Sequence, residues 1–228
     1  MSEQEQNTGK SLKQVAYETL KQKIITCQIT PGSILTEDML CEELNASRTP
    51  VRDAVGRLEQ EHLVSIMPKK GIKVNRVSLN SIRELFEIRR MLEPAVVLWY
   101  GNRIQDEVYA RYIQQFQRTD MALQELFDLD QAFHQMFISA SGNRYFSSIY
   151  EMIADQVFRY RVLTSETFRL DATQQEHYEI AANCIRGEWD LASAAMLRHI
   201  ENSKLAIIDY VMKTNRNARN VFEEDEDD

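Results

Sequence analysis

Apolar residues recur at helical spacing over most of this chain, and one short alternating stretch interrupts them near the N-terminus. The helical spacing at the start of the chain predicts helices over residues 12–26, 37–44 and 47–58. Residues 64–74 instead alternate apolar and polar side chains around the turn Pro68-Lys69-Lys70-Gly71, which predicts a β-hairpin. The order helix, helix-turn-helix, hairpin predicts a winged helix-turn-helix domain over residues 11–76.

Beyond residue 76 the alternating pattern ends and helical periodicity continues alone. The periodicity is broken at Gly101, at Ser141-Gly142-Asn143 and at Gly187. The helical stretches cover residues 78–101, 105–118, 121–140, 144–163, 171–186 and 188–213. Residues 77–215 are therefore predicted to form an all-α antiparallel bundle of about six or seven helices, so that the chain as a whole is mainly α.

The two ends of the chain carry no such periodicity. Residues 1–10 are polar and are predicted to form a flexible leader. Residues 216–228 end in Glu-Glu-Asp-Glu-Asp-Asp, which has no apolar side chain available for packing. This acidic tail is predicted to be disordered.

Composition narrows the class of protein. Of the 228 residues, 43% are hydrophobic and 27% are charged, as in an ordinary globular protein. No apolar run approaches the roughly 18 residues that cross a bilayer, and the polar N-terminus has no signal-peptide core. Cys27, Cys41 and Cys184 are widely spaced and odd in number, which is typical of reduced thiols. These features predict a cytoplasmic protein with no membrane partner.

The net charge of −8 is unevenly distributed along the chain. Residues 1–76 hold 11 Lys and Arg against 10 Asp and Glu, whereas the acidic excess lies in the remainder and most strongly in the tail. A near-neutral first domain can still bind DNA if its basic residues share one surface. Overall charge therefore does not exclude a nucleic-acid partner.

The predicted helix at residues 47–58 has the character of a DNA-reading element. Its apolar face leaves Arg48, Arg52 and Arg57 outward, and arginine can pair with two acceptors of guanine in the major groove, worth about 1–3 kcal/mol of discrimination. The hydroxyls of Ser47 and Thr49 suit phosphates, as do the lysines at the hairpin tip. The predicted DNA-binding residues are Ser47, Arg48, Thr49, Arg52, Arg57, Lys69, Lys70 and Gly71.

Three of the four histidines and one aspartate form a candidate metal site. Asp130 and His134 are four residues apart, so they project from one helix face, and His177 and His199 lie on two later predicted helices. If those helices pack antiparallel, the four side chains converge on one ion, and imidazole favours Zn, Ni and similar metals. Such a site leaves positive charge that attracts an anionic ligand into an open position.

Three functions are compatible with this candidate site. The metal can hold an acid that is sensed, it can activate water in a hydrolase or lyase, or it can be purely structural. Arg89 is the first candidate to bind a carboxylate effector, and its alternative role is an ion pair with Glu87 or Glu93. Asn143 is a second effector candidate, and Arg159 or Arg161 are lesser ones.

Three segments of the first domain are distinctive: Pro31-Gly32, the run Ser47-Arg48-Thr49-Pro50-Val51-Arg52-Asp53-Ala54, and the wing Lys70-Gly71-Ile72-Lys73-Val74. With these segments the first domain resembles the GntR family of bacterial transcription regulators. Two departures stand where the family usually has glycine: Cys27-Gln28 before the Pro-Gly turn, and His62. If position 62 requires a positive φ, histidine tolerates it better than a β-branched residue does.

The second domain is similar to the FadR-type branch of that family, whose C-terminal domain is called FCD. The similar segments are Glu87-Ile88-Arg89 with Leu92-Glu93, Asp130 with Phe133-His134, Ser141-Gly142-Asn143, Glu176-His177 and Arg198-His199-Ile200. In that branch the Asp and the three His at these positions bind a divalent metal. The resemblance therefore implies one divalent ion per chain, held by Asp130, His134, His177 and His199.

Together these features predict a metabolite-responsive bacterial transcription regulator that is not an enzyme. It is expected to act as a repressor, to bind a palindromic operator as a homodimer, and to sense a small organic acid at the metal. The alternative is a metal-dependent hydrolase or lyase that uses the same four residues.

Overall fold

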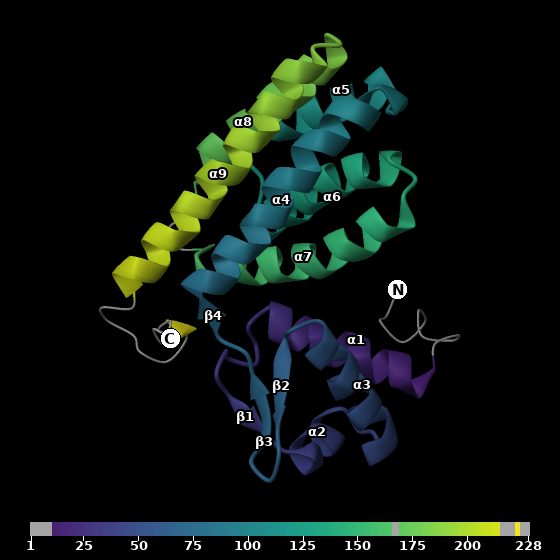
Figure 1. Cartoon of the computed structure of the whole chain (residues 1–228), viewed down its shortest axis with the longest axis vertical. Helices are drawn as coiled ribbons and strands as arrows, with labels where there is room; N and C mark the ends of the chain where they lie inside the picture. Colours follow the sequence, from purple (N-terminus) through teal and green to yellow (C-terminus); the bar gives the residue numbers. More distant parts are fainter. Residues whose placement is uncertain (1–10, 166–168, 215–221, 224–228) are drawn as a thin grey trace. The chain divides into compact units, whose positions relative to one another are not determined.

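The computed structural model describes residues 11–165, 169–214 and 222–223 (Figure 1). These residues divide into two compact units, and the division along the chain falls between Val77 and Ser78. The predicted leader lies outside the described residues. So does the predicted acidic tail, apart from Phe222–Glu223, which forms a short strand, β5, paired with β4 (Val77–Ser78).

The first unit confirms the winged helix-turn-helix prediction. Its helices are α1 (Leu12–Ile25), α2 (Glu37–Glu43) and α3 (Arg48–Gln60). Its sheet contains β1 (Ile34–Leu35), β2 (Val64–Met67) and β3 (Gly71–Val74) in the antiparallel order β1-β3-β2. Strand β1 was not predicted, because two residues are too few to show alternation.

The core of this unit forms where α1 packs against α3. The side chains of Leu20, Ile24, Leu40 and Leu58 are almost completely buried there. Gly71 opens β3 with φ +115°, and a Cβ at this position would lie 2.5 Å from the carbonyl oxygen of Leu35. The glycine is therefore required by the close approach of β1 as well as by the turn.

Among the residues described, four residues of the first unit adopt a left-handed backbone without being glycine: Cys27, Asn45, His62 and Lys69. The φ angles are +57° at Cys27 and +58° at His62. These are the two places at which the sequence departs from the glycines usual in the similar family. A left-handed conformation costs an L-residue roughly 1–2 kcal/mol, so the backbone retains its path here at a local cost in stability.

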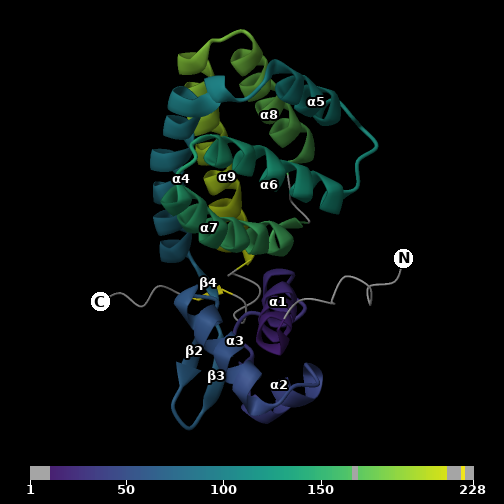
Figure 2. The ribbon, with the colours of Figure 1, turned by 90° about the vertical axis from the view of Figure 1, so that its right-hand side faces the viewer.

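The second unit is all-α among the residues described (Figure 2). Six α-helices form it, and a short 3-10 turn, η2 (Gly101–Arg103), follows the first of them. The six are α4 (Leu79–Tyr100), α5 (Asp106–Phe116), α6 (Leu123–Ala140), α7 (Arg144–Leu163), α8 (Leu170–Ile185) and α9 (Trp189–Thr214). This confirms the predicted bundle of six or seven helices, with breaks close to the predicted ones.

The helices of the bundle surround a core that is partly polar. α4 packs against α6 and α9, and α8 packs against α5 and α9. Aromatic rings fill one part of the core, including the edge-to-face pairs of Phe133 with Phe116 and with Phe137. Beside them lies a group of buried charged and imidazole side chains, which is unusual for a core unless each member is paired or binds a ligand. None of the helices described is long and apolar enough to cross a membrane.

Candidate metal centre and nucleic-acid interface

Four potential metal ligands meet in the core of the second unit. Asp130 and His134 come from α6, His177 from α8 and His199 from α9, and all four side chains are buried. One ligand atom from each lies within 4.8 Å of all the others. Nε2 of His177 is 3.1 Å from Nε2 of His134 and 3.2 Å from Oδ1 of Asp130. Ligands held about 2.0–2.2 Å from a single ion lie at comparable separations from one another, so the four side chains fit one metal.

The histidines are oriented by groups behind them. Nδ1 of His134 lies 2.5 Å from Oε2 of Glu93 on α4, and Nδ1 of His199 lies 2.9 Å from Oε2 of Glu176 on α8. A carboxylate on Nδ1 fixes the tautomer in which Nε2 carries a lone pair, as is usual for metal-binding histidines. Within the described residues, Nδ1 of His177 has no hydrogen-bond partner, and its ring stacks on Phe116 instead.

The Nε2 atoms fit a metal because their lone pairs have little else to bind. Nε2 of His199 is buried and has no hydrogen-bond partner among the residues described. The Nε2 atoms of His134 and His177 face each other at 3.1 Å, so they repel unless a cation or a proton lies between them. A buried acceptor without a donor costs about 1–3 kcal/mol, and a divalent ion would remove that cost.

The electrostatics favour the metal-binding protonation states of Asp130, His177 and His199. Burial lowers the pKa of His177 well below its usual value, and the neighbouring His199 lowers it further. Burial also lowers the pKa of His199, an effect only partly offset by the hydrogen bond with Glu176. Burial alone would raise the pKa of Asp130, but the guanidinium of Arg161 and the three histidines hold it below its ordinary range. Neutral imidazoles and an ionised carboxylate are the forms that bind a metal.

Two buried arginines stand beside the ligands. Arg161 on α7 forms an ion pair with Oδ2 of Asp130. Arg89 on α4 binds Glu93 through two contacts, of 2.5 Å from Nε and 3.3 Å from Nη2. Burial would raise the pKa of Glu93, but Arg89 and His134 lower it to about 2. Glu93 therefore links the Arg89 guanidinium to a ligand histidine.

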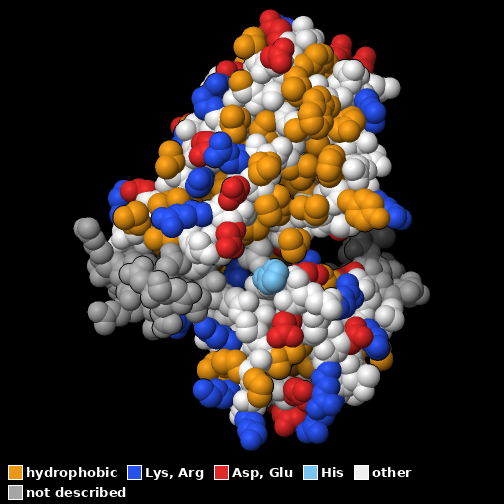
Figure 3. All heavy atoms as spheres, viewed as in Figure 1, with side chains coloured by type: hydrophobic (Ala, Val, Ile, Leu, Met, Phe, Trp, Pro, Cys, Tyr) orange, Lys and Arg blue, Asp and Glu red, His pale blue; other side chains and the backbone are white. Residues whose placement is uncertain are grey.

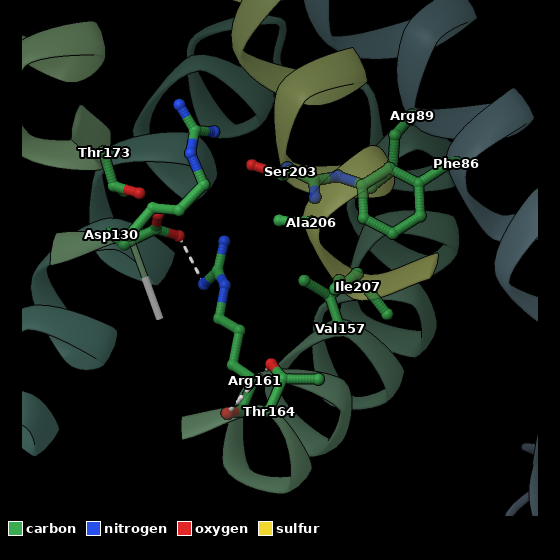
Figure 4. A pocket seen from close by; sticks show the side chains of 11 residues that line it. Phe86, Arg89, Asp130, Val157, Arg161, Thr164, Thr173, Ser203, Ala206 and Ile207 are labelled. Atoms are coloured by element: carbon green, nitrogen blue, oxygen red, sulfur yellow. Dashed lines mark hydrogen bonds and ion pairs between the residues drawn. The ribbon is translucent and has the colours of Figure 1, made fainter. Parts of the chain in front are cut away.

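A cavity with an empty volume of about 460 Å³, part of it open to solvent, reaches the metal centre at Asp130 (Figure 4). Arg161 points across it toward Asp130, and hydroxyl groups stand around it on Thr164, Thr173 and Ser203. An apolar wall is formed by Phe86, Val157, Ala206 and Ile207. A polar end next to an apolar wall is typical of a site for a small organic ligand.

The structure places the two predicted effector residues, Arg89 and Asn143, in different surroundings. Arg89 lines the cavity, and although Glu93 occupies part of its guanidinium, its Nη1 is buried without a hydrogen-bond partner in the described structure. Asn143 is not among the residues that line the cavity. Its side-chain oxygen caps α7 by accepting hydrogen bonds from the backbone N–H groups of Tyr145 and Phe146. The effector role of Asn143 therefore stays a prediction, for which this cavity gives no support.

Several residues that line the cavity were not predicted from the sequence. Arg161 was only a lesser candidate, and Arg169, Thr173 and Ser203 were not identified. Asp130, Arg161 and Arg169 come from separate segments of the chain. No sequence motif therefore shows that they lie around the same cavity. Glu176 was recognised beside His177, but its role as partner of His199 depends on the packing of α8 against α9.

The predicted DNA-reading surface lies on α3 of the first unit. Arg48 and Arg52 have side chains that are 66% and 65% exposed, and Ser47 precedes the helix without a side-chain cap hydrogen bond. Both arginines are held by acidic residues of α2: Arg48 to Asp38 at 3.0 Å and Arg52 to Glu37 at 2.8 Å. Exposed pairs of this kind contribute little and separate readily when a phosphate or base competes.

Arg57 does not point outward as predicted. Its guanidinium lies 3.4 Å from the centre of the Tyr17 ring and donates to Oε1 of Gln14 at 2.9 Å. These contacts tie α3 to α1, because Arg57 lies five residues after Arg52 and therefore about 140° further round the helix. At the hairpin tip, by contrast, Lys69 and Lys70 are exposed, and Lys69 has φ +64°.

The fold and the buried centre define a class of protein in which a winged helix-turn-helix unit is joined to a helical ligand-binding unit. Residues 12–74 match the bacterial regulatory proteins of the gntR family, and residues 84–202, more than half of the chain, match the FCD domain. The chain belongs to the GntR family and carries an FCD domain. The matched families are transcriptional regulators and not enzymes, so the hydrolase or lyase alternative is set aside.

Characterised relatives are regulators as well. The HTH-type transcriptional repressor RspR of Escherichia coli (strain K12) is 30% identical over 118 residues, which are 52% of this chain and 52% of that protein. The gluconate operon transcriptional repressor of Bacillus subtilis (strain 168) is 34% identical over 82 residues, 36% of this chain and 33% of that protein. The chain thus spans about half the length, or less, of the curated relatives it matches.

Solved structures share the fold. Escherichia coli McbR/YncC has a TM-score of 0.72 at 18% identity, over 89% of this chain and 99% of that one. The Zn²⁺-bound FCD domain of TM0439 has a TM-score of 0.52 at 24% identity, over 60% of this chain and 97% of that one. At these identities the likeness concerns the fold alone.

Proposed function

We propose that this protein is a cytoplasmic repressor that binds a palindromic operator as a homodimer and is controlled by a small carboxylate held at a divalent metal. The observation that carries the proposal is the buried set Asp130, His134, His177 and His199, which opens at Asp130 onto a cavity with a free arginine donor. The metal would be Zn or Ni, one per chain, since three imidazoles and one carboxylate suit such ions. Bound there, it would supply a Lewis acid that holds a carboxylate.

Operator recognition is assigned to the exposed end of α3. Arg48 and Arg52 lie in the first turns of this helix, the part that enters the major groove in helix-turn-helix docking. The N-terminal N–H groups of the helix, the hydroxyls of Ser47 and Thr49, and the wing lysines would bind phosphates. The pairs with Glu37 and Asp38 would open as the arginines reach the bases.

The homodimer is supported by an apolar seam along α4, made of Ile88, Met91, Leu98 and Trp99. These side chains are 39%, 72%, 36% and 62% exposed, and Figure 3 shows hydrophobic side chains gathered over α4 on this face of the second unit. Ile88, Met91, Ala95 and Leu98 repeat at intervals of three and four residues, the spacing with which one helix packs against another.

The seam suits a second copy of the same chain. An antiparallel pairing of α4 with α4 would place Ile88 opposite Trp99 of the second copy. The same pairing would bring the exposed Glu84 at one end opposite the exposed Arg103 at the other. A twofold interface needs this kind of self-complementarity.

Control of the operator requires that the ligand bind one arrangement of the dimer better than another. The four candidate metal ligands and the cavity lie among helices α4, α6, α7, α8 and α9. A ligand that draws these helices together would therefore change how the proposed dimer presents its two recognition helices.

The experiment that tests the proposal begins with selection of binding sites from random duplex DNA by the purified protein. A twofold-symmetric sequence is expected to be enriched, with half-sites about one helical turn apart. Fluorescence anisotropy with that duplex then measures affinity for the Zn²⁺-loaded and chelator-treated protein across a panel of small acids. Enrichment of no sequence, or an affinity unchanged by every acid and by the metal, would overturn the proposal.

A further inference from the structure

We infer that the cavity beside the metal centre selects an acid with two negative charges, a dicarboxylate, over an acid with one. The inference rests on the metal centre and the acid sensing proposed above. It is carried by the balance of buried charges around the cavity and by one arginine donor that has no partner.

The charged side chains of the cavity already neutralise one another. Those that line it are Arg89, Asp130, Arg161 and Arg169. Asp130 pairs with Arg161. The other two arginines pair with carboxylates just behind the cavity wall: Arg89 with Glu93 and Arg169 with Glu176. Three guanidinium groups are therefore paired with three carboxylates.

A divalent ion placed on the four ligands would upset this balance by two positive charges. The site would retain that excess in a region where the ligands and two of the three arginines are buried. Uncompensated charge is expensive in such surroundings, because little water is present to screen it. A monocarboxylate would remove half of the excess, whereas a dicarboxylate would remove all of it.

Geometry gives the second carboxylate a place to bind. Arg89 is 1% exposed, and the Nη1 of its guanidinium has no hydrogen-bond partner within the residues described. Glu93 touches both Arg89 and His134, so this donor lies one carboxylate away from a metal ligand. On the other side, Glu176 connects Arg169 to His199 in the same way.

The remaining walls suit a ligand with a short apolar body. Phe86, Val157, Ala206 and Ile207 offer apolar contact to a chain of a few carbons. Thr173 and Ser203 add hydroxyl groups at the polar side. A four-carbon diacid such as succinate or malate has the required combination of short body and two charged ends.

Isothermal titration of the Zn²⁺-loaded, full-length protein tests the inference with matched acids. Succinate and butyrate have four carbons each and differ in one carboxylate, and gluconate adds hydroxyl groups to a single charge. We expect succinate to bind roughly tenfold or more tightly than butyrate or gluconate, the gain of one charge-assisted contact. In the chelator-treated protein the charges already balance, so the preference for succinate should disappear.

The outcomes separate this inference from the proposed function. If butyrate or gluconate binds the Zn²⁺-loaded protein as tightly as succinate, charge selection is wrong and acid sensing stands. If no acid binds, both are wrong. A preference for succinate that persists unchanged without metal also overturns the inference, because the excess charge would not be its cause.

A pair of variants adds a residue-level test. Arg89→Gln removes the unpartnered donor and should bring the affinity for succinate down to that for butyrate. Arg90→Gln is the matched control, since Arg90 is the next residue on α4 and its side chain is 52% exposed. Circular dichroism checks that the Arg89→Gln variant folds. If it does not fold, the comparison of acids on the unaltered protein still tests the inference.

Discussion

Glu176 and His199 lie on adjacent helices, and Oε2 of the glutamate is 2.9 Å from Nδ1 of the histidine. The same glutamate accepts from Nδ2 of Asn202 at 2.8 Å and pairs with Arg169 at 3.0 Å. Its carboxylate is therefore held in place from three directions. The contact orients His199 so that its Nε2 lies with the other candidate ligands, and Glu176 would therefore control how tightly a metal binds there.

The first prediction concerns this contact. Glu176→Gln should weaken Zn²⁺ binding about tenfold to a hundredfold, the usual effect of losing such a partner, as measured by competition with a chromophoric chelator. Glu179→Gln is the control, because Glu179 is on the same helix, 47% exposed, and pairs only with Arg198 in the described structure. His177→Ala should lose the metal altogether, and one Zn²⁺ per chain in that variant would show that the assigned ligands are wrong.

The second prediction separates two arginines of α3. Arg52→Ala should lower affinity for the selected operator by about 1–3 kcal/mol while leaving the thermal midpoint unchanged, because its side chain is exposed. Arg57→Ala should do the reverse, since it removes the stacking on Tyr17 that joins α3 to α1. Operator anisotropy and thermal unfolding of both variants check the contrast. If both variants lose operator affinity equally, Arg57 belongs to the DNA-binding surface.

The third prediction concerns the α4 seam. Met91→Glu places a charge in the middle of the seam and should convert the proposed dimer to a monomer, as measured by light scattering at micromolar concentration. Met39→Glu on α2 is the matched control, since Met39 is 51% exposed and lies in the first unit. A Met91→Glu protein that stays dimeric would exclude the seam as the interface.

The fourth prediction follows from the burial of Cys184. Burial raises the pKa of this thiol to about 12, although a hydrogen bond with Tyr109 lowers it slightly. Thiolate is the reactive form, so Cys184 should resist iodoacetamide at pH 8 in the folded protein and react once it is unfolded. Mass spectrometry of digested protein gives the labelled positions, and the partly exposed Cys27 and Cys41 serve as internal controls. Labelling of Cys184 at the rate of Cys41 would contradict its buried position.

The fifth prediction concerns two of the left-handed residues, Cys27 and His62. Cys27→Gly and His62→Gly should each raise the free energy of unfolding by about 1 kcal/mol, because glycine adopts a positive φ without steric cost. Chemical denaturation of the single and double variants measures the gain. Gln28→Gly, one residue further along, should destabilise instead, and a gain there would show that the effect is not conformational.

The sequence predicted the helices of both units well because their periodicity is strong and their breaks are marked by glycine or a capping residue. It also predicted that Asp130, His134, His177 and His199 would converge, which their spacing and order made possible. Strand β1 was missed because its two residues are defined only by pairing with β3.

The contacts that the sequence did not predict at the site have a common physical origin. Arg57 and Asn143 were expected to face a ligand, and the structure shows contacts within the chain for both: Tyr17 and Gln14 for the first, and the α7 backbone for the second. Arg161 and Arg169 were under-valued because their partners, Asp130 and Glu176, are distant in sequence. Periodicity gives the face of a helix, but it does not give the neighbour that the face meets.

Asp130 belongs both to the ligand set and to the wall of the cavity. If metal and acid bind as proposed, neither equilibrium is independent of the other. The factor by which the ion tightens the acid must equal the factor by which the acid tightens the ion. When metal is scarce, bound acid would then raise the affinity of the protein for the ion. When acid is scarce, a chelator would remove the ion more easily. Operator affinity would then depend on the concentrations of both the metal and the acid, which are coupled through the carboxylate of Asp130.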